Sequence, residues 1–233
     1  MSDATELRTV WLGRVPYQEA LILQRALLTQ RQRHECPDTL LLLEHPHVIT
    51  LGRRGVASDV LASAGDLAKS GVNVIETDRG GQTTYHGPGQ LVAYGIIDLR
   101  SAGLGPVSYV RHLELAAIET LSRWGIRSYR VEGKTGVWVG GGDEWRKESK
   151  IAAIGVKVSR GVTMHGLALN VSTDLAFFDR IVPCGMPGVP AASIASLCGV
   201  HVSTEEVGFD FAEKLGRQIG RYLRRAPKDA VAA

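Results

Sequence analysis

The chain has 233 residues, of which 44% are hydrophobic and 22% charged, so it is long enough for one folded domain and is not a disordered chain. The formal net charge of +3, from 27 basic and 24 acidic residues, gives no indication of a nucleic-acid-binding protein, which usually carries a concentrated basic face. Three cysteines are too few, and odd in number, for a disulfide framework. The N-terminal segment lacks a signal-peptide pattern and no apolar run could span a membrane. We therefore expect a cytoplasmic protein without nucleic-acid or membrane partners.

The first half of the chain is predicted to contain one helix and several strands. The helix covers residues 17–33, where Ala20, Leu23, Leu27 and Leu28 form an apolar stripe. Strands are predicted over 39–45, 72–78 and 91–99. Segment 52–71 is predicted to be a loop that could include a turn of helix, and the Gly/Pro-rich segment 79–90 is predicted to be a loop or a hairpin.

The second half begins with a helix over about 110–124, where Gly125 suits the position after its end. Four strand-like runs follow: RSYRVEG, GVWV, KIAAIGVKVSR and TMHGLALNVS. The Gly-rich segment 140–149 between two of them is predicted to be a flexible hairpin tip. A last helix begins near Thr204, after a capping-box pattern of Ser203 and Glu206, and runs to about Arg224. This order predicts one α+β domain over residues 8–224 with a mostly antiparallel sheet, and a flexible tail over 225–233.

Cys184 is the strongest candidate for a nucleophile, because IVPCGMPGVP places it in a tight loop whose backbone amides can face an oxyanion. The alternative is a buried free cysteine, and Cys36 and Cys198 fit that alternative better. A thiol needs a base or a cation beside it. Histidines near strand ends could serve, as could Lys150 if it is partly desolvated, although a solvated lysine at a strand end is the simpler interpretation of Lys150.

The histidines do not have the spacing of a metal site: HExxH and CxxC are both missing. The loop RGGQTTYHGPGQ could hold an acyl or carboxamide group through its backbone amides, or it could be a structural hairpin. It does not match a phosphate-binding P-loop. The 27 glycines of the chain indicate close approaches of the backbone, often to a ligand.

Several segments together resemble the lipoyl(octanoyl) transferases. LLLLEHP, DRGGQTTYHGPGQLVAY, TGVWV, KIAAIGVKVSRGVTMHGLALNV and IVPCG occur in the order and spacing of that family, and the resemblance extends from about residue 8 to 223. It implies a mixed sheet flanked by helices, as in biotin protein ligases and lipoate ligases. It also implies transfer of an octanoyl group from octanoyl-acyl carrier protein to a lysine of lipoyl domains, which occur in 2-oxoacid dehydrogenase E2 subunits and in the glycine cleavage H protein. No cofactor is implied, neither ATP nor a metal.

The resemblance also implies residue roles. Cys184 is the expected nucleophile and Lys150 its proton-transfer partner. The longer hairpin before Lys150 brings in Lys147, and a shift by one strand residue would turn the side chain to the other face. The substrate-binding residues are expected to be Arg79, Gly80, Gly81, Gln82, Thr83, Thr84, Tyr85, His86, Ala153, Ile154, Gly155, Gly166, Leu167 and Ala168.

Alternation near these motifs predicts that Tyr85, Leu167 and Leu169 form walls around the acyl chain, and we expect His86 to position the substrate. Basic residues could steer acidic partners, with candidates at Arg53, Arg54, Arg146, Lys147 and Arg160. Three alternatives stay open: an ATP-dependent ligase of the same fold, a non-catalytic acyl- or carrier-binding protein, and a thioesterase-like hydrolase.

Overall fold

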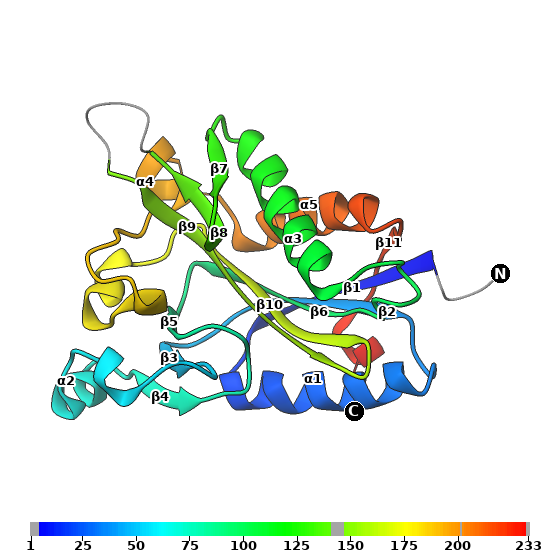
Figure 1. Cartoon of the computed structure of the whole chain (residues 1–233), viewed down its shortest axis with the longest axis horizontal. Coiled ribbons are helices and arrows are strands. Elements are labelled where there is room, and N and C mark those ends of the chain that lie inside the picture. Colours follow the sequence, from blue (N-terminus) through cyan, green and yellow to red (C-terminus); the bar gives the residue numbers. More distant parts are fainter. Residues whose placement is uncertain (1–4, 141–146, 201, 232–233) are drawn as a thin grey trace.

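The computed structural model describes residues 5–140, 147–200 and 202–231, and at Cys184 it describes the backbone only. Its main sheet has eight strands in the order β11-β1-β2-β6-β10-β9-β8-β7 (Figure 1). The β1–β2 and β1–β11 pairs are parallel and the other pairs of this sheet are antiparallel. The strands are β1 (Glu6–Arg14), β2 (Asp38–Glu44), β6 (Gln90–Ile96), β7 (Ser128–Val131), β8 (Lys134–Val139), β9 (Ser149–Ser159), β10 (Val162–Asn170) and β11 (Tyr222–Arg225).

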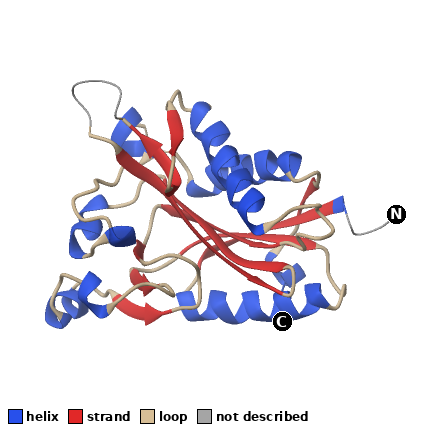
Figure 2. Ribbon diagram, in the orientation of Figure 1, coloured by secondary structure: helices blue, strands red, loops and turns tan. Residues whose placement is uncertain are grey.

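Helices cover both faces of this sheet (Figure 2). Helix α1 (Tyr17–Gln32) lies on one face, whereas α3 (Pro106–Ser122) and α5 (Thr204–Gln218) lie together on the other. Successive side chains of a strand point to opposite faces, so the run of leucines in β2 serves both cores. Leu40 and Leu42 pack in the cluster beneath α3 and α5, and Leu41 and Leu43 pack in the cluster beneath α1. The prediction of an α+β fold with a mostly antiparallel sheet is confirmed.

A smaller sheet, in the order β4-β3-β5, lies beside the main one and supports the candidate site. Its strands are β3 (Val48–Leu51), β4 (Asn73–Glu76) and β5 (Thr83–His86). The remaining short elements are η2 (Ala57–Asp59), α2 (Ala64–Lys69), η3 (Leu175–Arg180), η4 (Pro183–Gly185), α4 (Ile194–Cys198) and η5 (Lys228–Val231). The sequence predicts neither β3 nor β5 as a strand, because each has four residues and depends on pairing with the other.

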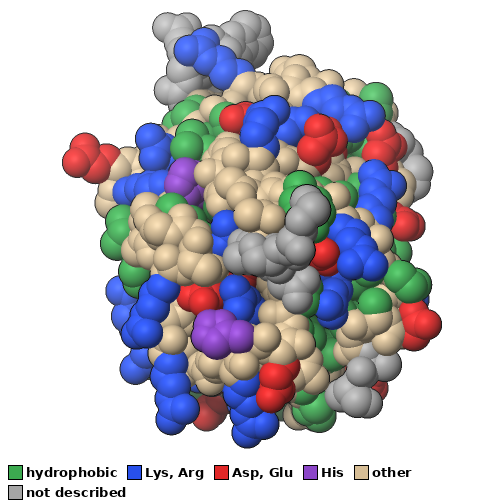
Figure 3. Space-filling model, turned by 90° about the vertical axis from the view of Figure 1, so that its right-hand side faces the viewer, with side chains coloured by type: hydrophobic (Ala, Val, Ile, Leu, Met, Phe, Trp, Pro, Cys, Tyr) green, Lys and Arg blue, Asp and Glu red, His purple; other side chains and the backbone are tan. Residues whose placement is uncertain are grey.

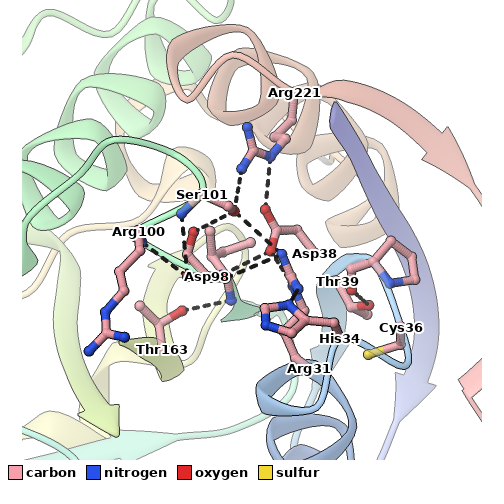
Figure 4. A network of polar contacts seen from close by, with 12 residues as sticks. Arg31, His34, Cys36, Asp38, Thr39, Asp98, Arg100, Ser101, Thr163 and Arg221 are labelled. Atoms are coloured by element: carbon pink, nitrogen blue, oxygen red, sulfur yellow. Dashed lines mark hydrogen bonds and ion pairs between the residues drawn. The ribbon is translucent and has the colours of Figure 1, made fainter. Parts of the chain in front are cut away.

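A buried ionic network ties α1 to the main sheet and to the C-terminal region (Figure 4). The Asp38 carboxylate is 1% exposed and accepts hydrogen bonds from Nε of Arg31 and Nε of Arg221, both at 2.8 Å. The Asp98 backbone N–H donates to the same carboxylate at 2.9 Å. Arg221 also donates to the Ser101 hydroxyl at 2.9 Å. Each charge of the network therefore has a partner, as burial of charge requires.

The C-terminal region contradicts the predicted flexible tail over 225–233 and the predicted helix end near Arg224. Helix α5 ends at Gln218, and residues 222–225 form β11, which pairs in parallel with β1. The Ala226 backbone N–H donates to Thr9 O at 2.9 Å, and Val231 is 4% exposed in the core beneath α1. Residues 232–233 lie outside the described residues. At the other end, β1 begins at Glu6 with Leu7 fully buried, so the folded part starts before residue 8.

Charges are mixed on the molecular face drawn in Figure 3, where Lys and Arg side chains are interspersed with Asp and Glu and hydrophobic side chains occur in small groups. None of the described helices combines the length and the apolar composition needed to span a membrane.

Candidate functional site

Lys150 is the second residue of β9. It lines a pocket together with residues on both sides of Cys184. We call it the lysine pocket. The backbone of Lys150 is held against the segment after Cys184: its N–H donates to Pro190 O at 2.9 Å and its carbonyl accepts from Ala192 N at 3.0 Å. The turn η4 carries Cys184, and its neighbours Pro183 and Met186 line the pocket. The full lining is Thr84, Gln90, Lys150, Ile151, Ala152, Ala153, Ala168, Asn170, Phe178, Pro183, Met186, Val189, Pro190 and Ala191.

The turn at Cys184 also contacts the Gly-rich loop through Gln82. Gly185 has φ +64°, and a Cβ atom there would lie 2.3 Å from Nε2 of Gln82. The Gln82 amide therefore occupies the space that a side chain at residue 185 would need, and glycine satisfies both the backbone angle and this contact.

A second pocket, which we call the histidine pocket, contains most of the residues predicted to bind substrate. It is lined by Arg79, Gly81, Gln82, Thr84, His86, Tyr94, Ala153, Ile154, Gly155, His165, Gly166, Leu167 and Ala168. Thr84, Ala153 and Ala168 line both pockets, so the two adjoin along β9 and β10. The structure thus joins the Lys150 and Cys184 region to the Gly-rich loop.

The Gly-rich loop crosses β9 at very short range. The Gly80 N–H donates to Val156 O at 3.2 Å. A Cβ atom on Gly155 would lie 2.6 Å from Gly80 O, and one on Gly80 would lie 2.8 Å from Val156 O. Only glycine allows this approach of two backbones, which is the role that the high glycine content indicated.

Arg79 is fixed by β3 behind this loop. Its Nη2 donates to Thr50 O at 2.7 Å and to Thr50 Oγ1 at 2.8 Å, and its Nη1 donates to Gly80 O at 3.0 Å. The residue is 7% exposed, so the guanidinium places a buried positive charge at the wall of the histidine pocket.

His86 belongs to a chain of polar side chains that connects the two pockets. The Gln90 amide donates to Asn170 Oδ1 at 2.9 Å and to Tyr85 O at 3.2 Å, so its oxygen faces Nδ1 of His86, at 2.7 Å. Nδ1 therefore carries the proton that is donated to Gln90. Complete burial, together with the positive charge of nearby Arg79, holds the pKa of His86 well below its usual value. The ring is neutral at pH 7, with an acceptor nitrogen at Nε2.

His45 and His165 are also neutral by burial. Burial lowers the pKa of His45 to about 4. Its Nδ1 donates to Val15 O at 2.6 Å, and its Nε2 accepts from the Tyr94 hydroxyl at 2.8 Å. Burial likewise lowers the pKa of His165, whose Nε2 lies 2.9 Å from Asp78 Oδ1. Burial alone would raise the pKa of Asp78, but hydrogen bonds from Lys157 and His165 lower it to about 2.

Three of the predicted substrate-binding residues do not line either pocket. Gly80 acts through its backbone contact with β9. Thr83 and Tyr85 point to the opposite side of β5 from Thr84 and His86, because side chains alternate along a strand. Thr83 donates to Asp59 at 2.7 Å, and Tyr85 is fully buried against Phe177, with ring centroids 4.9 Å apart.

The predicted acyl-chain walls are therefore partly wrong. Tyr85 belongs to the core of the small sheet and Leu169 to the core beneath α3 and α5, whereas Leu167 does line the histidine pocket. The side chain of Cys184 and the hairpin residues 141–146, including Arg146, lie outside the described part of the chain. Arg53, Arg54, Lys147 and Arg160 are exposed.

Sequence reasoning missed residues 189–191 as part of the lysine pocket. They lie beside the start of β9, where Lys150 and Ala191 form an isolated parallel bridge. It also missed Phe178 and Tyr94. The Pro-Gly-Val-Pro composition signals a loop but says nothing of where the loop packs. Within the described residues, no group of three or more His, Cys, Asp and Glu side chains is placed to bind a metal ion.

Comparisons with known proteins give the family of the chain. Residues 16–216 match the family model described as the lipoyl protein ligase A/B catalytic domain. An octanoyltransferase of Solibacter usitatus is 51% identical over 206 residues, which are 88% of this chain and 90% of that protein. One from Chloroflexus aurantiacus is 48% identical over 219 residues, 94% of each chain.

Among solved structures, a bipartite lipoate protein ligase from Thermoplasma acidophilum superimposes with a TM-score of 0.73 at 19% identity, covering 97% of this chain and 90% of that one. A lipoate-protein ligase A bound with ATP superimposes with a TM-score of 0.72 at 18% identity, covering 97% and 92%. At this level of identity the two structures support the fold alone.

Proposed function

The chain belongs to the lipoyl(octanoyl) transferases, a family of acyltransferases that act in protein lipoylation, and on that premise we propose that it uses a Cys184 acyl-enzyme. The donor is octanoyl-acyl carrier protein. The acceptor is a lysine of a lipoyl domain in 2-oxoacid dehydrogenase E2 subunits or the glycine cleavage H protein. The observation that supports this most is that Lys150 and the residues flanking Cys184 line one pocket.

In the first half-reaction the Cys184 thiol gives its proton to the Lys150 amine, and the thiolate attacks the carbonyl carbon of the donor thioester. The tetrahedral oxyanion collapses, breaks the bond to the carrier thiol and leaves the octanoyl group on Cys184. The Lys150 ammonium returns the proton to the departing carrier thiolate. Backbone N–H groups of the turn at Cys184 stabilise the oxyanion.

In the second half-reaction the amine of the lipoyl-domain lysine attacks the Cys184 thioester. Lys150 accepts the proton that the amine loses and passes it to the Cys184 thiolate as the amide forms. The products are the octanoylated domain and the free thiol. The donor thioester supplies the activation, so we propose that neither ATP nor a metal takes part, and that the reaction occurs in the cytoplasm.

The acyl chain extends from Cys184 along β9 and β10, from the lysine pocket toward the histidine pocket. The walls support this path, because Ile151, Ala152, Ala153 and Ala168 are apolar. Each buried methylene contributes about 0.8 kcal/mol to binding. Neutral His86 fits the path better than a charged ring would, and we assign it to positioning the substrate.

The test is to incubate the purified protein with octanoyl-acyl carrier protein in the absence of ATP and to record its intact mass, followed by peptide mapping. We expect an octanoyl adduct on Cys184 that disappears when a lipoyl domain is added, with octanoylated domain as the product. Cys184→Ser removes both the adduct and the transfer. Cys198→Ser is the matched control, since the Cys198 thiol is half-buried against Trp124 O and lines neither pocket.

Three results would contradict the proposal. Octanoylation that requires ATP and free octanoate identifies a ligase. Free octanoate as the main product in the presence of a lipoyl domain identifies a hydrolase. Full transfer by Cys184→Ser would remove the cysteine from the mechanism.

A further inference from the structure

Trp138 faces Lys150 across the antiparallel pair of β8 and β9. The two residues are direct partners in the ladder, next to a bulge at which Val137 pairs with Ala152. Their side chains share one face, and Lys150 Nζ lies 5.0 Å from the centroid of the Trp138 ring. The indole is fully buried and its Nε1 donates to Lys134 O at 3.2 Å, so its orientation is fixed.

Gly136 makes room for the lysine side chain to reach this ring. Its φ is +123°, and a Cβ atom there would lie 2.7 Å from Lys150 Cε and 2.5 Å from Ala152 O. The backbone at Gly136 is held from helix α3, because its N–H donates to Oε1 of Glu114 at 3.0 Å. Glu114 is fully buried, and its other oxygen accepts from Arg111 at 2.7 Å. Helix α3, a bare glycine and the indole together define the path of the Lys150 side chain.

A second cation, Lys134, lies 5.2 Å from the same ring. The Lys134 Nζ forms an ion pair with Glu148 at 2.8 Å, and the Lys134 side chain is 41% exposed. Lys150 lines the lysine pocket, next to the residues that flank Cys184. The π-face of an indole attracts an ammonium group and not a neutral amine. A ring in this place therefore attracts the Lys150 ammonium and restricts the rotation of its long side chain.

We propose that Trp138 is a positioning residue for octanoyl transfer, whose ring holds the Lys150 ammonium in the lysine pocket beside the turn of Cys184. This inference rests on the proposed function, in which Lys150 exchanges protons with the Cys184 thiol. The ammonium that Lys150 forms when it takes the Cys184 proton is then held beside the reacting thiolate.

The test compares Trp138→Phe, which keeps a ring, with Trp138→Leu, which removes it. The readouts are the rate at which iodoacetamide alkylates Cys184, kcat and KM for octanoyl transfer, and the thermal midpoint. We expect Trp138→Leu to lower the alkylation rate and kcat by about tenfold with little change in KM, and Trp138→Phe to stay within about threefold of the parent. Trp124→Leu and Trp124→Phe are matched controls, because Arg123 lies 5.3 Å from that ring and neither residue lines the two pockets.

Trp138 is a core residue, so its loss also creates a cavity. Fluorinated tryptophans at position 138 keep the shape of the ring while weakening its attraction for a cation, and we expect the alkylation rate to fall stepwise with the number of fluorine atoms. Alkylation that is unchanged by fluorination, or equal losses in Trp138→Phe and Trp138→Leu that follow the thermal midpoint, would overturn the proposal. Cys184→Ser and Lys150→Ala, measured in the same transfer assay, distinguish failure of the proposed function from failure of the inference about Trp138. Full transfer by either variant contradicts the proposed function, whereas loss in both with no effect of the ring contradicts only the inference.

Discussion

Replacing Asp38 with alanine will destabilise the fold through the two arginines that it leaves behind. The carboxylate accepts three hydrogen bonds of 2.8–2.9 Å, and the side chains of Arg31 and Arg221 are only 6% and 5% exposed. Removing one partner of a buried ion pair costs about 3–5 kcal/mol, because the remaining charge stays buried without compensation. Arg31 keeps Asp98 at 3.7 Å and Arg221 keeps Ser101 at 2.9 Å, which favours the lower half of that range.

The assay is urea unfolding followed by circular dichroism, with the midpoint and the slope fitted separately. A loss of about 3–5 kcal/mol corresponds to a decrease of about 10 °C in Tm for a domain of this size. Asp38→Asn should lie between the parent and Asp38→Ala, since an amide oxygen still accepts. The control, Glu213→Ala on the exposed side of α5, should change the free energy of unfolding by less than about 0.5 kcal/mol. A cost below about 1 kcal/mol for Asp38→Ala would show that the arginines find water or other partners, and would refute the reasoning.

Three further predictions concern the two pockets and their surroundings. Gly185→Ala should lower the rate of octanoyl transfer by about tenfold or more, because the new methyl group overlaps Gln82. The control is Gly188→Ala, where φ is +74° and the space is open, so this variant has only the backbone strain of about 1–2 kcal/mol. Equal transfer rates in the two variants would argue against the overlap. Gln90→Met should cost about 1–3 kcal/mol in urea unfolding, because it strands the partners of three buried hydrogen bonds, and a neutral result would contradict this. Folding lowers the pKa of His45 from 6.5 to about 4, so between these pH values the unfolded chain binds more protons than the folded one. The free energy of unfolding should therefore fall by about 3 kcal/mol as the pH decreases from 7 to 4. His45→Gln should remove that part of the pH dependence.

Elements with a strong local pattern could be predicted from the sequence. The helix predicted over 17–33 is observed over Tyr17–Gln32, and the Ser203 hydroxyl does accept from Glu206 N at the start of α5. The missed strands are β1, β3, β5 and β11. Each pairs with residues distant in sequence, and β3, β5 and β11 have only four residues each. Such pairing has no local signal, because periodicity reports only which face of an element is apolar.

The site could be predicted to a similar extent. The resemblance located the Gly-rich loop and the lysine strand, and the structure brings them to adjoining pockets. Tyr85 was misplaced because residues 79–90 were predicted as a loop or hairpin. Thr83 to His86 form a strand instead, so only Thr84 and His86 face the pocket. Because a core lies on the other side of β5 as well, the sequence TTYH does not distinguish the two faces.

The position of β11 has a consequence for synthesis of the protein on the ribosome. Strand β1 lies between β2 and β11, so its outer edge has no partner until residues 222–225 have left the exit tunnel. The same residues bring Arg221 to Asp38, which until then has only Arg31 and the Asp98 N–H. A nascent chain of more than 200 residues therefore exposes the unpaired edge of β1, and its Asp38 carboxylate still lacks Arg221. An unpaired strand edge favours edge-to-edge association with other chains. Chaperone dependence during translation, and aggregation when synthesis pauses before β11, follow from this order of assembly.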